Sequence, residues 1–126
     1  MHWLSFGVAL LVSAAIIVIG ILYLLNPRGV AQGFGLPMPE EGRNIAWWLR
    51  LKGVRDIVSG AVVLATMHWG DTRILGIVLF IEAFTALGDM SVILAARGST
   101  KAAFGMHGLT AAVMIAAAIP LIMGVA

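Results

Sequence analysis

Seven ionisable residues stand inside stretches that are otherwise apolar, and they carry most of the chemistry that this sequence offers. They are Arg50, Lys52, Arg55, Asp56, Glu82, Asp89 and His107. Carboxylates and imidazoles exchange protons, whereas guanidinium and ammonium groups bind and orient anions. An ionisable side chain at the centre of a membrane helix costs about 2.5–3.5 kcal/mol on insertion scales, so such residues mark candidate functional sites. We therefore expect these groups to face the protein interior and to neutralise one another.

Glu82 is the candidate catalytic acid. A helical rise of about 1.5 Å per residue places it about 20 Å from the end of its segment next to the third loop, and on this measure it is deeper than the other carboxylates. Apolar surroundings favour the neutral carboxylic acid, which can donate a proton. Asp56, Asp89 and His107 are its predicted partners in catalysis, and Arg55 is predicted to orient the substrate.

Helical spacing adds polar neighbours to these groups. Glu82 and Asp89 lie two turns apart, so they share a face with Thr85. Isomerisation or cyclisation of a terpenoid, sterol or quinone-like molecule suits an acid–base site of this kind. The predicted substrate-binding residues are Arg55, Lys52, Ser59, Thr85, Thr110 and Tyr23.

Structural roles compete with chemistry at several of these positions. Arg50 is close enough to the membrane surface to reach it along its apolar stem, and it points away from the other charges. For His107 two roles are weighed equally: it caps the start of a helix or lies at the membrane interface, or it belongs to the site. Arg55 and Asp56 can also form a purely structural buried pair with the next span.

The segments that carry these residues are long enough to cross a bilayer. Of the 126 residues, 61% are hydrophobic and 11% are charged, about half the charged share of a typical soluble domain. With about 20 apolar residues needed per span, the pattern predicts spans at about 3–25, 45–67, 74–96 and 102–125. Strand alternation is absent from the sequence. The predicted fold is all-α, a four-transmembrane-helix bundle that forms a single domain over residues 1–126.

The connections between the spans predict the orientation in the membrane. The first span lacks the basic start of a signal peptide, so we interpret it as a membrane span that is not cleaved off. It ends at Asn26-Pro27, where a polar linker over residues 26–44 begins. Basic residues concentrate in the first and third loops, whereas the second loop holds only Arg73. Because loops rich in Lys and Arg stay in the cytoplasm, these two loops are predicted to be cytoplasmic and both termini outside.

Several classes of function receive no support from the sequence. There is no cysteine, so a thiolate metal site is excluded, and the three histidines fall on both membrane faces, so no metal site is predicted. Phosphate-binding and dinucleotide-binding glycine motifs are absent, and no cofactor is predicted. The net charge of +2 comes without a Lys/Arg cluster among aromatic residues, so no nucleic-acid partner is predicted.

Three segments carry a resemblance to a known family. They are W-L-R-L-K-G-V-R-D at 48–56, L-G-D at 87–89 and H-G-L-T at 107–110. Together they resemble a domain-of-unknown-function family of small four-helix membrane proteins. The resemblance implies the fold and the membrane location and brings no activity with it. Glu82 lies outside the matched segments, whereas the family motifs fall on Arg50, Lys52, Arg55, Asp56, Asp89 and His107.

Three functions remain open at this point. The first is a membrane-embedded site or enzyme that binds or converts a lipophilic small molecule, with the lipid bilayer as the other partner. The second is a small proton-coupled transporter, which requires a homo-oligomer because four helices are few. The third is a non-catalytic accessory subunit whose buried charges only fix the helix register. A closed pocket favours the first, a polar path to the outer face the second, and a groove without a cavity the third.

Overall fold

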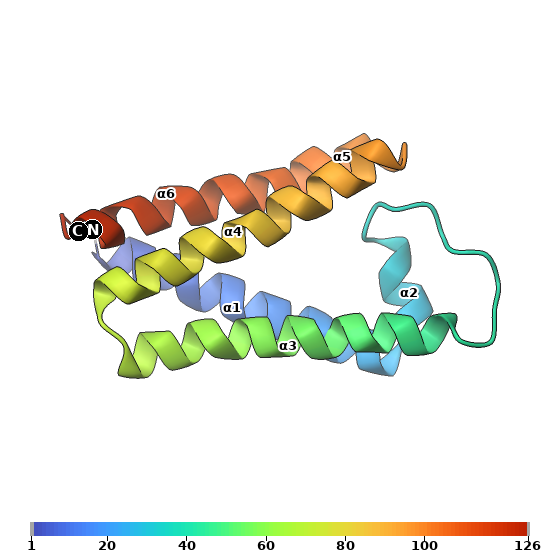
Figure 1. The fold of residues 1–126 in the computed structure, drawn as a ribbon, viewed down its shortest axis with the longest axis horizontal. Helices are drawn as coiled ribbons and strands as arrows, with labels where there is room; N and C mark the ends of the chain where they lie inside the picture. Colours follow the sequence, from blue (N-terminus) through green and yellow to red (C-terminus); the bar gives the residue numbers. More distant parts are fainter. Residues whose placement is uncertain (1, 126) are drawn as a thin grey trace.

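Helices make up nearly the whole molecule in the computed structural model, which describes residues 2–125 (Figure 1). No strand occurs among these residues, so the all-α prediction is confirmed. The last three elements follow one another without a break and form a single rod over Thr100–Met123. The elements are α1 (His2–Leu25), α2 (Pro27–Gln32), α3 (Ile45–Trp69), α4 (Thr72–Ala95), α5 (Thr100–Ala102), the π-helical η1 (Ala103–Gly108) and α6 (Leu109–Met123).

Three helical segments in the described part of the chain are long and apolar enough to cross a membrane: Trp3–Leu25, Thr72–Ala95 and Thr100–Met123. With 23 or 24 residues each, they extend about 35 Å, slightly more than the hydrocarbon core of a bilayer. Their large apolar side chains are mostly exposed on the protein surface, where lipid can cover them. The protein is therefore an integral membrane protein. The remaining long helix, α3, has 25 residues and carries the charged segment.

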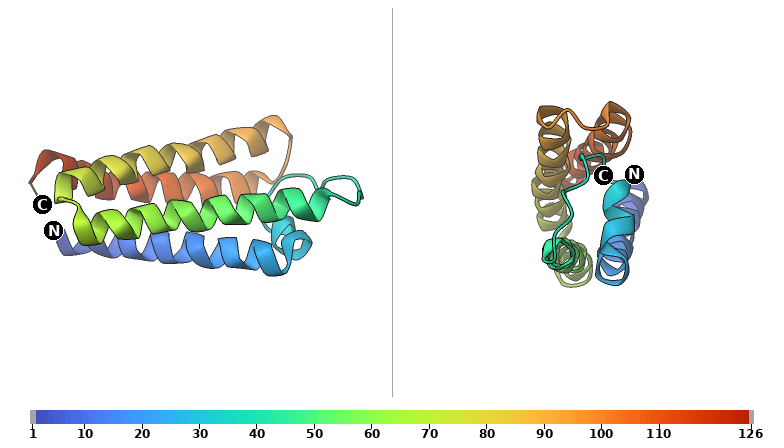
Figure 2. Two further views of the ribbon diagram at one scale, coloured as in Figure 1. Left: turned by 60° about the horizontal axis from the view of Figure 1, so that its bottom comes forward. Right: turned by 90° about the vertical axis from the view of Figure 1, so that its right-hand side faces the viewer.

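The long helices form two pairs, α1 with α3 and α4 with α6 (Figure 2). Glycine allows the backbones of the first pair to approach closely. A Cβ atom at Gly53 would lie 2.6 Å from the carbonyl oxygen of Gly20, and one at Gly60 would lie 2.7 Å from that of Ser13. Small residues at such contacts are typical of helix packing in membranes.

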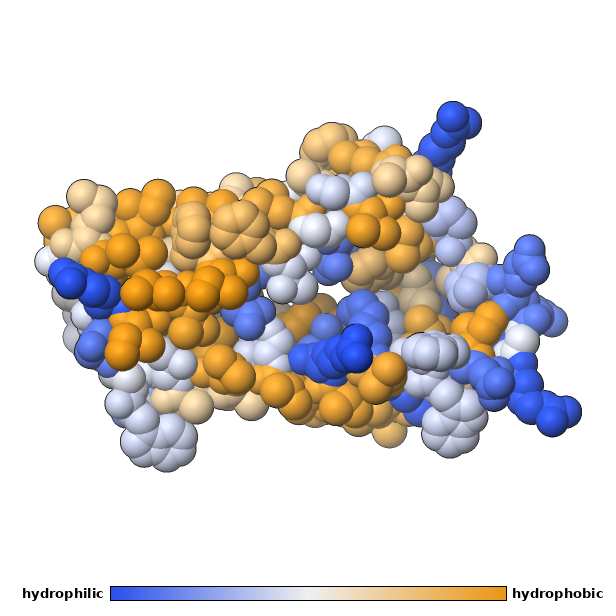
Figure 3. All heavy atoms as spheres, viewed as in Figure 1, coloured by the Kyte–Doolittle hydropathy of each residue, from blue (hydrophilic) through white to orange (hydrophobic). Residues whose placement is uncertain are grey.

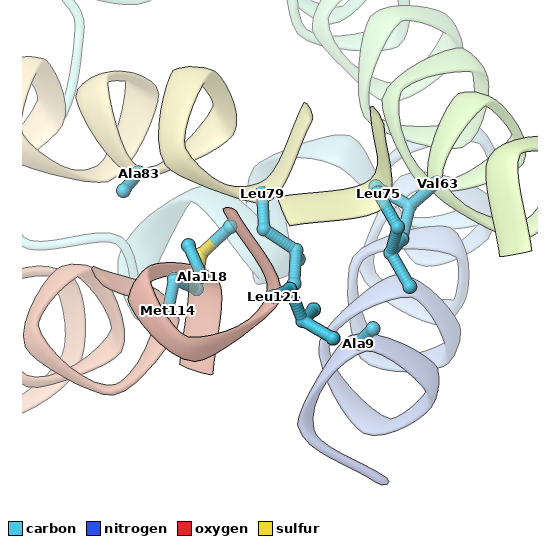
Figure 4. Close-up of a cluster of buried hydrophobic side chains, with 8 residues drawn as sticks. All are labelled: Ala9, Val63, Leu75, Leu79, Ala83, Met114, Ala118 and Leu121. Carbon is cyan, nitrogen blue, oxygen red and sulfur yellow. The ribbon is translucent and has the colours of Figure 1, made fainter. Parts of the chain in front are cut away.

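An apolar core joins the two pairs at the end where α3 turns into α4 (Figure 4). At this end, α1 begins and α6 ends (Figure 1). Gly76 brings α4 against α6, since a Cβ there would lie 2.8 Å from that of Leu121. We call this region the closed end and define it by its core residues: Ala9, Val63, Leu75, Leu79, Ala83, Met114, Ala118 and Leu121.

At the opposite end, α3 and α4 diverge, and the linker after α1 folds back between the pairs (Figure 1). The backbone N–H of Ser99 donates to the carbonyl oxygen of Gly35 over 2.8 Å. Gly35 has a φ of 111°, and a Cβ there would lie 2.7 Å from that of Ala102. Only glycine fits this conformation and this space. We call this end, with the linker 26–44 and the turn 96–99, the open end.

The structure adds two features to the sequence-based elements. The first helix ends at Leu25, before the predicted stop at Asn26-Pro27, and the linker then begins with the short helix α2. Pro27 stands in the first turn of α2, and the Asn26 side chain accepts a hydrogen bond from the Gly29 N–H, an arrangement that starts helices. The fourth predicted span contains the π-helical segment η1, which hydrophobic periodicity alone does not predict.

Candidate functional site

Lys52 lies at the centre of a group of polar and aromatic side chains at the open end. Its Nζ is 2.8 Å from Oδ2 of Asp56, one turn further along α3. The same ammonium lies 4.5 Å from the centroid of the Tyr23 ring and 4.8 Å from that of Phe34. A carboxylate and two aromatic faces therefore stabilise one cation.

His107 joins the linker to α4. Its Nε2 is 3.0 Å from the backbone carbonyl oxygen of Phe34. A carbonyl oxygen only accepts, so Nε2 carries the hydrogen. Nδ1 faces Oδ2 of Asp89 at 3.7 Å. Asp89 and His107 therefore face each other as a carboxyl and an imidazole nitrogen, two groups that can each bind or release a proton.

The two pairs meet at Phe34. The centroid of its ring lies 4.8 Å from Nζ of Lys52 and 4.6 Å from the centroid of the His107 ring. We call this group the open-end cluster. Its members come from α1, the linker, α3, α4 and η1, and they are Tyr23, Phe34, Lys52, Asp56, Asp89 and His107.

A cavity of about 230 Å³ lies beside the cluster. Lys52 is the only charged residue in its lining. Tyr23 also lines it and is 2% exposed, yet its hydroxyl has no hydrogen bond among the described residues. Buried hydroxyls are normally paired, so this one is available to a polar atom of a bound molecule. The lining is Tyr23, Ala31, Phe34, Leu36, Pro37, Met38, Pro39, Leu49 and Lys52.

Glu82 lies apart from the open-end cluster. Its Oε2 accepts a hydrogen bond of 2.5 Å from Oγ of Ser59, which links α4 to α3. No hydrogen bond or ion pair in the described chain connects Glu82 to Asp56, Asp89 or His107. The structure therefore brings together three of the four predicted catalytic residues and places the predicted acid in a contact of its own.

The other predicted substrate-binding residues divide into two sets. Tyr23 and Lys52 belong to the cluster, and Ser59 bonds Glu82. Arg55, Thr85 and Thr110 are exposed, and within residues 2–125 none of them makes a hydrogen bond or an ion pair. Hydrophilic side chains nevertheless surround a hollow between α3 and α4 on the face shown in Figure 3.

The seven ionisable groups were expected to neutralise one another. Lys52 pairs with Asp56 and Asp89 pairs with His107, whereas Arg55 and Glu82 have no ion pair in the described chain. Arg50 was expected to reach the membrane surface along its apolar stem. Its Nε donates to the carbonyl oxygen of Leu24 over 3.0 Å, at the end of α1, where the last carbonyls lack partners within the helix.

Sequence reasoning missed Phe34. Its ring contacts Lys52 and lies 4.6 Å from the His107 ring, and its carbonyl holds His107. An aromatic residue before a glycine in a polar linker is a weak signal. Only the folding of the linker between the helix pairs makes this residue part of the site.

A search for relatives places the chain in a family. A family model described as a domain of unknown function, DUF4267, matches residues 13–121. The chain belongs to this family. The match covers every member of the open-end cluster, so the cluster lies within the DUF4267 domain. Neither the comparison with curated proteins nor the comparison with solved structures found a match.

The chemistry available to this DUF4267 site is acid–base chemistry by side chains. No group of three or more His, Asp or Glu residues in the described part of the chain is arranged to hold a metal ion. The site offers one carboxyl–imidazole pair, one ammonium held by a second carboxylate, and one buried phenol without a hydrogen bond.

Proposed function

We propose that this protein binds a lipophilic small molecule in the cavity beside Lys52, which α1, the linker and α3 line, and exchanges a proton with it at the neighbouring open-end cluster. The observation that carries the proposal is the cavity beside Lys52, which has apolar walls, one ammonium and one unpaired phenol. Ligand sites are concave and mostly apolar, with a few polar groups that fix orientation. A small apolar molecule with one hydrogen-bonding head matches this lining.

We also propose that α3 is a fourth transmembrane helix. Trp48 and Trp69 are exposed near its two ends. Their separation of 21 residues, 69 minus 48, corresponds to about 32 Å, close to the thickness of the hydrocarbon core. Tryptophan is enriched at both membrane interfaces. The basic first and third loops lie together at the open end (Figure 1), which supports a cytoplasmic open end and outer termini.

The Asp89–His107 pair is the proposed proton exchanger. The pair gives its proton to one atom of the ligand, and the base it becomes takes a proton from another atom. No net proton is consumed, which is the balance that an isomerisation or a cyclisation requires. Lys52 and Tyr23 would bind the polar head of the ligand, and the aromatic walls would exclude water.

The closed end argues against the transporter alternative. The core that joins the helix pairs there is apolar, and the buried polar side chains among the described residues are two serines of α1, Ser5 and Ser13, which carry no ionisable group. This end therefore offers no ionisable relay from Glu82 to the outer face. The accessory-subunit alternative predicts a groove without a cavity, whereas the open end has one of about 230 Å³.

Native mass spectrometry of the protein released gently from its host membrane tests the binding proposal. We expect a co-purifying small molecule in the wild type that is lost in Lys52→Met and Asp56→Asn. Glu82→Gln is the matched control, because it changes a carboxylate in the neighbouring Ser59 contact and should keep the ligand. An absence of bound molecules in the wild type would contradict the proposal.

Deuterium transfer tests the proton exchange. The ligand identified by mass is incubated with the protein in D₂O, and its deuterium content is followed. We expect wild-type protein to introduce deuterium at a carbon atom, and Asp89→Asn and His107→Gln to slow this by about 100-fold or more. If deuterium enters the ligand at the same rate in all three proteins, Asp89 and His107 do not exchange protons with it, and only the binding proposal stands.

A further inference from the structure

Arg55 is a cation without a partner in the middle of α3. It is the eleventh of the 25 residues of α3, about 15 Å from the start of that helix. Its side chain is exposed, and no hydrogen bond, ion pair or ring contact involves it within residues 2–125. An unpaired charge at such a depth is costly in lipid. An anion outside the chain would offset this cost.

Thr85 of α4 lies at about the same depth as Arg55 of α3. The Ser59–Glu82 hydrogen bond fixes the register of the two antiparallel helices. Four residues from Ser59 back to Arg55, and three from Glu82 on to Thr85, are steps of about 6 and 4.5 Å in the same direction, toward the open end. Thr85 is exposed, and its hydroxyl has no hydrogen bond in the described chain.

Both residues lie on the outer rim of the gap between α3 and α4. Their neighbours Asp56 and Ala86 are partly buried, whereas Arg55 and Thr85 are exposed. The face shown in Figure 3 has a hollow between α3 and α4 that hydrophilic side chains surround, between apolar surfaces. Val62 and Ile81 continue the same rims toward the closed end and are also exposed, so an apolar chain could lie along them.

The charge at this gap defines the chemistry of the ligand. Lys52 is already paired with Asp56, and Glu82 is bonded to Ser59. The guanidinium of Arg55 is therefore left with all its donors, and its planar fork matches a carboxylate or a phosphate.

We propose that the gap is a lateral portal in which Arg55 and Thr85 bind the carboxylate or phosphate head of an anionic amphiphile. The head enters sideways from the bilayer, and the apolar chain stays against the lipid-facing rim. This inference rests on the proposed function, because the portal binds the head of the entering ligand before the ligand reaches the cavity beside Lys52. The head can belong to a free lipophilic acid or to an anionic phospholipid.

Binding of three probes to the full chain in neutral detergent tests the portal. The probes are oleate, dioleoylphosphatidylglycerol and oleyl alcohol, and native mass spectrometry gives an apparent Kd for each. We expect Arg55→Gln to weaken binding of at least one anionic probe about tenfold or more and to leave oleyl alcohol within about twofold. The probe that responds identifies the source of the head group.

Three further variants complete the test. Arg55→Lys keeps the charge and should retain part of the preference for anions, and Thr85→Val should weaken anion binding several-fold. Arg73→Gln removes an exposed charge near the closed end and should change nothing. Anion binding that is unaffected by Arg55→Gln would overturn the portal.

The portal and the proposed function can fail separately. Leu36→Trp fills the cavity beside Lys52 and should abolish binding of oleyl alcohol. If it does so while Arg55→Gln has no effect, the portal is wrong and the binding cavity stands. If no probe binds to wild-type protein, both proposals are contradicted.

Discussion

The closed and open ends of this bundle are built from the same four rods, yet they differ in how the helix pairs meet. At the closed end, leucine and alanine side chains fill the space between the pairs, and eight residues form one buried core. At the open end, the pairs diverge around charged side chains, the linker and a cavity. Residue type, and not topology, decides which end closes.

The difference shows how a small membrane protein can keep a polar site without losing its fold. Close packing at the closed end and along α1 and α3 holds the rods together. The open end carries fewer apolar contacts and places its polar groups in pairs, which limits the cost of burying them. Regions of this kind are the less stable parts of a protein, and binding sites are often found there.

The largest effect should come from the closed end. Leu79→Ala removes a fully buried side chain and should lower the free energy of unfolding by about 2–5 kcal/mol. Thermal or chemical unfolding in detergent measures it. Leu11→Ala, at an exposed position, is the control and should stay within about 0.5 kcal/mol. Equal losses in the two variants would mean that the closed end has no special role in stability.

The next largest effect should come from the linker anchor, the contact of Gly35 with Ser99 and Ala102. Gly35→Ala adds a Cβ where φ is 111° and where Ala102 is 2.7 Å away, which should cost about 2–4 kcal/mol. Hydrogen exchange should show faster exchange of the Ser99 N–H, which bonds Gly35.

Gly105→Ala is the control for the linker anchor, because nothing lies within 4 Å of a Cβ at Gly105. Protection of the Ser99 N–H that is unchanged in Gly35→Ala would show that the linker is not held at this point.

His107 should have a smaller effect. His107→Leu removes the hydrogen bond to the Phe34 carbonyl and the partner of Asp89, which should destabilise the protein by about 1–3 kcal/mol. Limited proteolysis of the linker over residues 33–44 measures the loosening. His68→Leu, at an exposed position near the end of α3, should leave the cleavage rate as in the wild type. A linker that is cut equally fast in both variants would contradict a clamping role.

The smallest effect should come from the contact between α3 and α4. Ser59→Ala removes the donor to Glu82 and should cost about 1 kcal/mol, with ligand binding retained because the contact lies outside the cavity. Ser91→Ala, whose hydroxyl bonds its own helix, is the matched control. If Ser59→Ala loses the co-purifying ligand, the Ser59–Glu82 contact contributes to ligand binding and Glu82 belongs to the candidate site.

Much of the fold follows from the sequence, whereas the pairing within the site does not. Apolar runs such as 3–25 predict helices directly, because only a helix satisfies its own backbone in lipid. Helical spacing places Lys52 and Asp56 one turn apart on one face, although the sequence analysis did not pair them. The sequence cannot predict that Glu82 binds Ser59 while Asp89 meets His107, since the tilt of α4 relative to α3 determines these partners. Phe34 depends on the path of the linker, which Gly35 and Ser99 determine.

Photocrosslinking with a lipophilic diazirine tests the central claim most directly. The probe is activated on the protein in nanodiscs, and the labelled residues are mapped by peptide mass spectrometry. The account predicts saturable labelling of the cavity lining at the open end, centred on Tyr23, Phe34 and Lys52, and none of the closed-end core. Labelling that is confined to lipid-facing side chains and never saturates would contradict a ligand site at the open end.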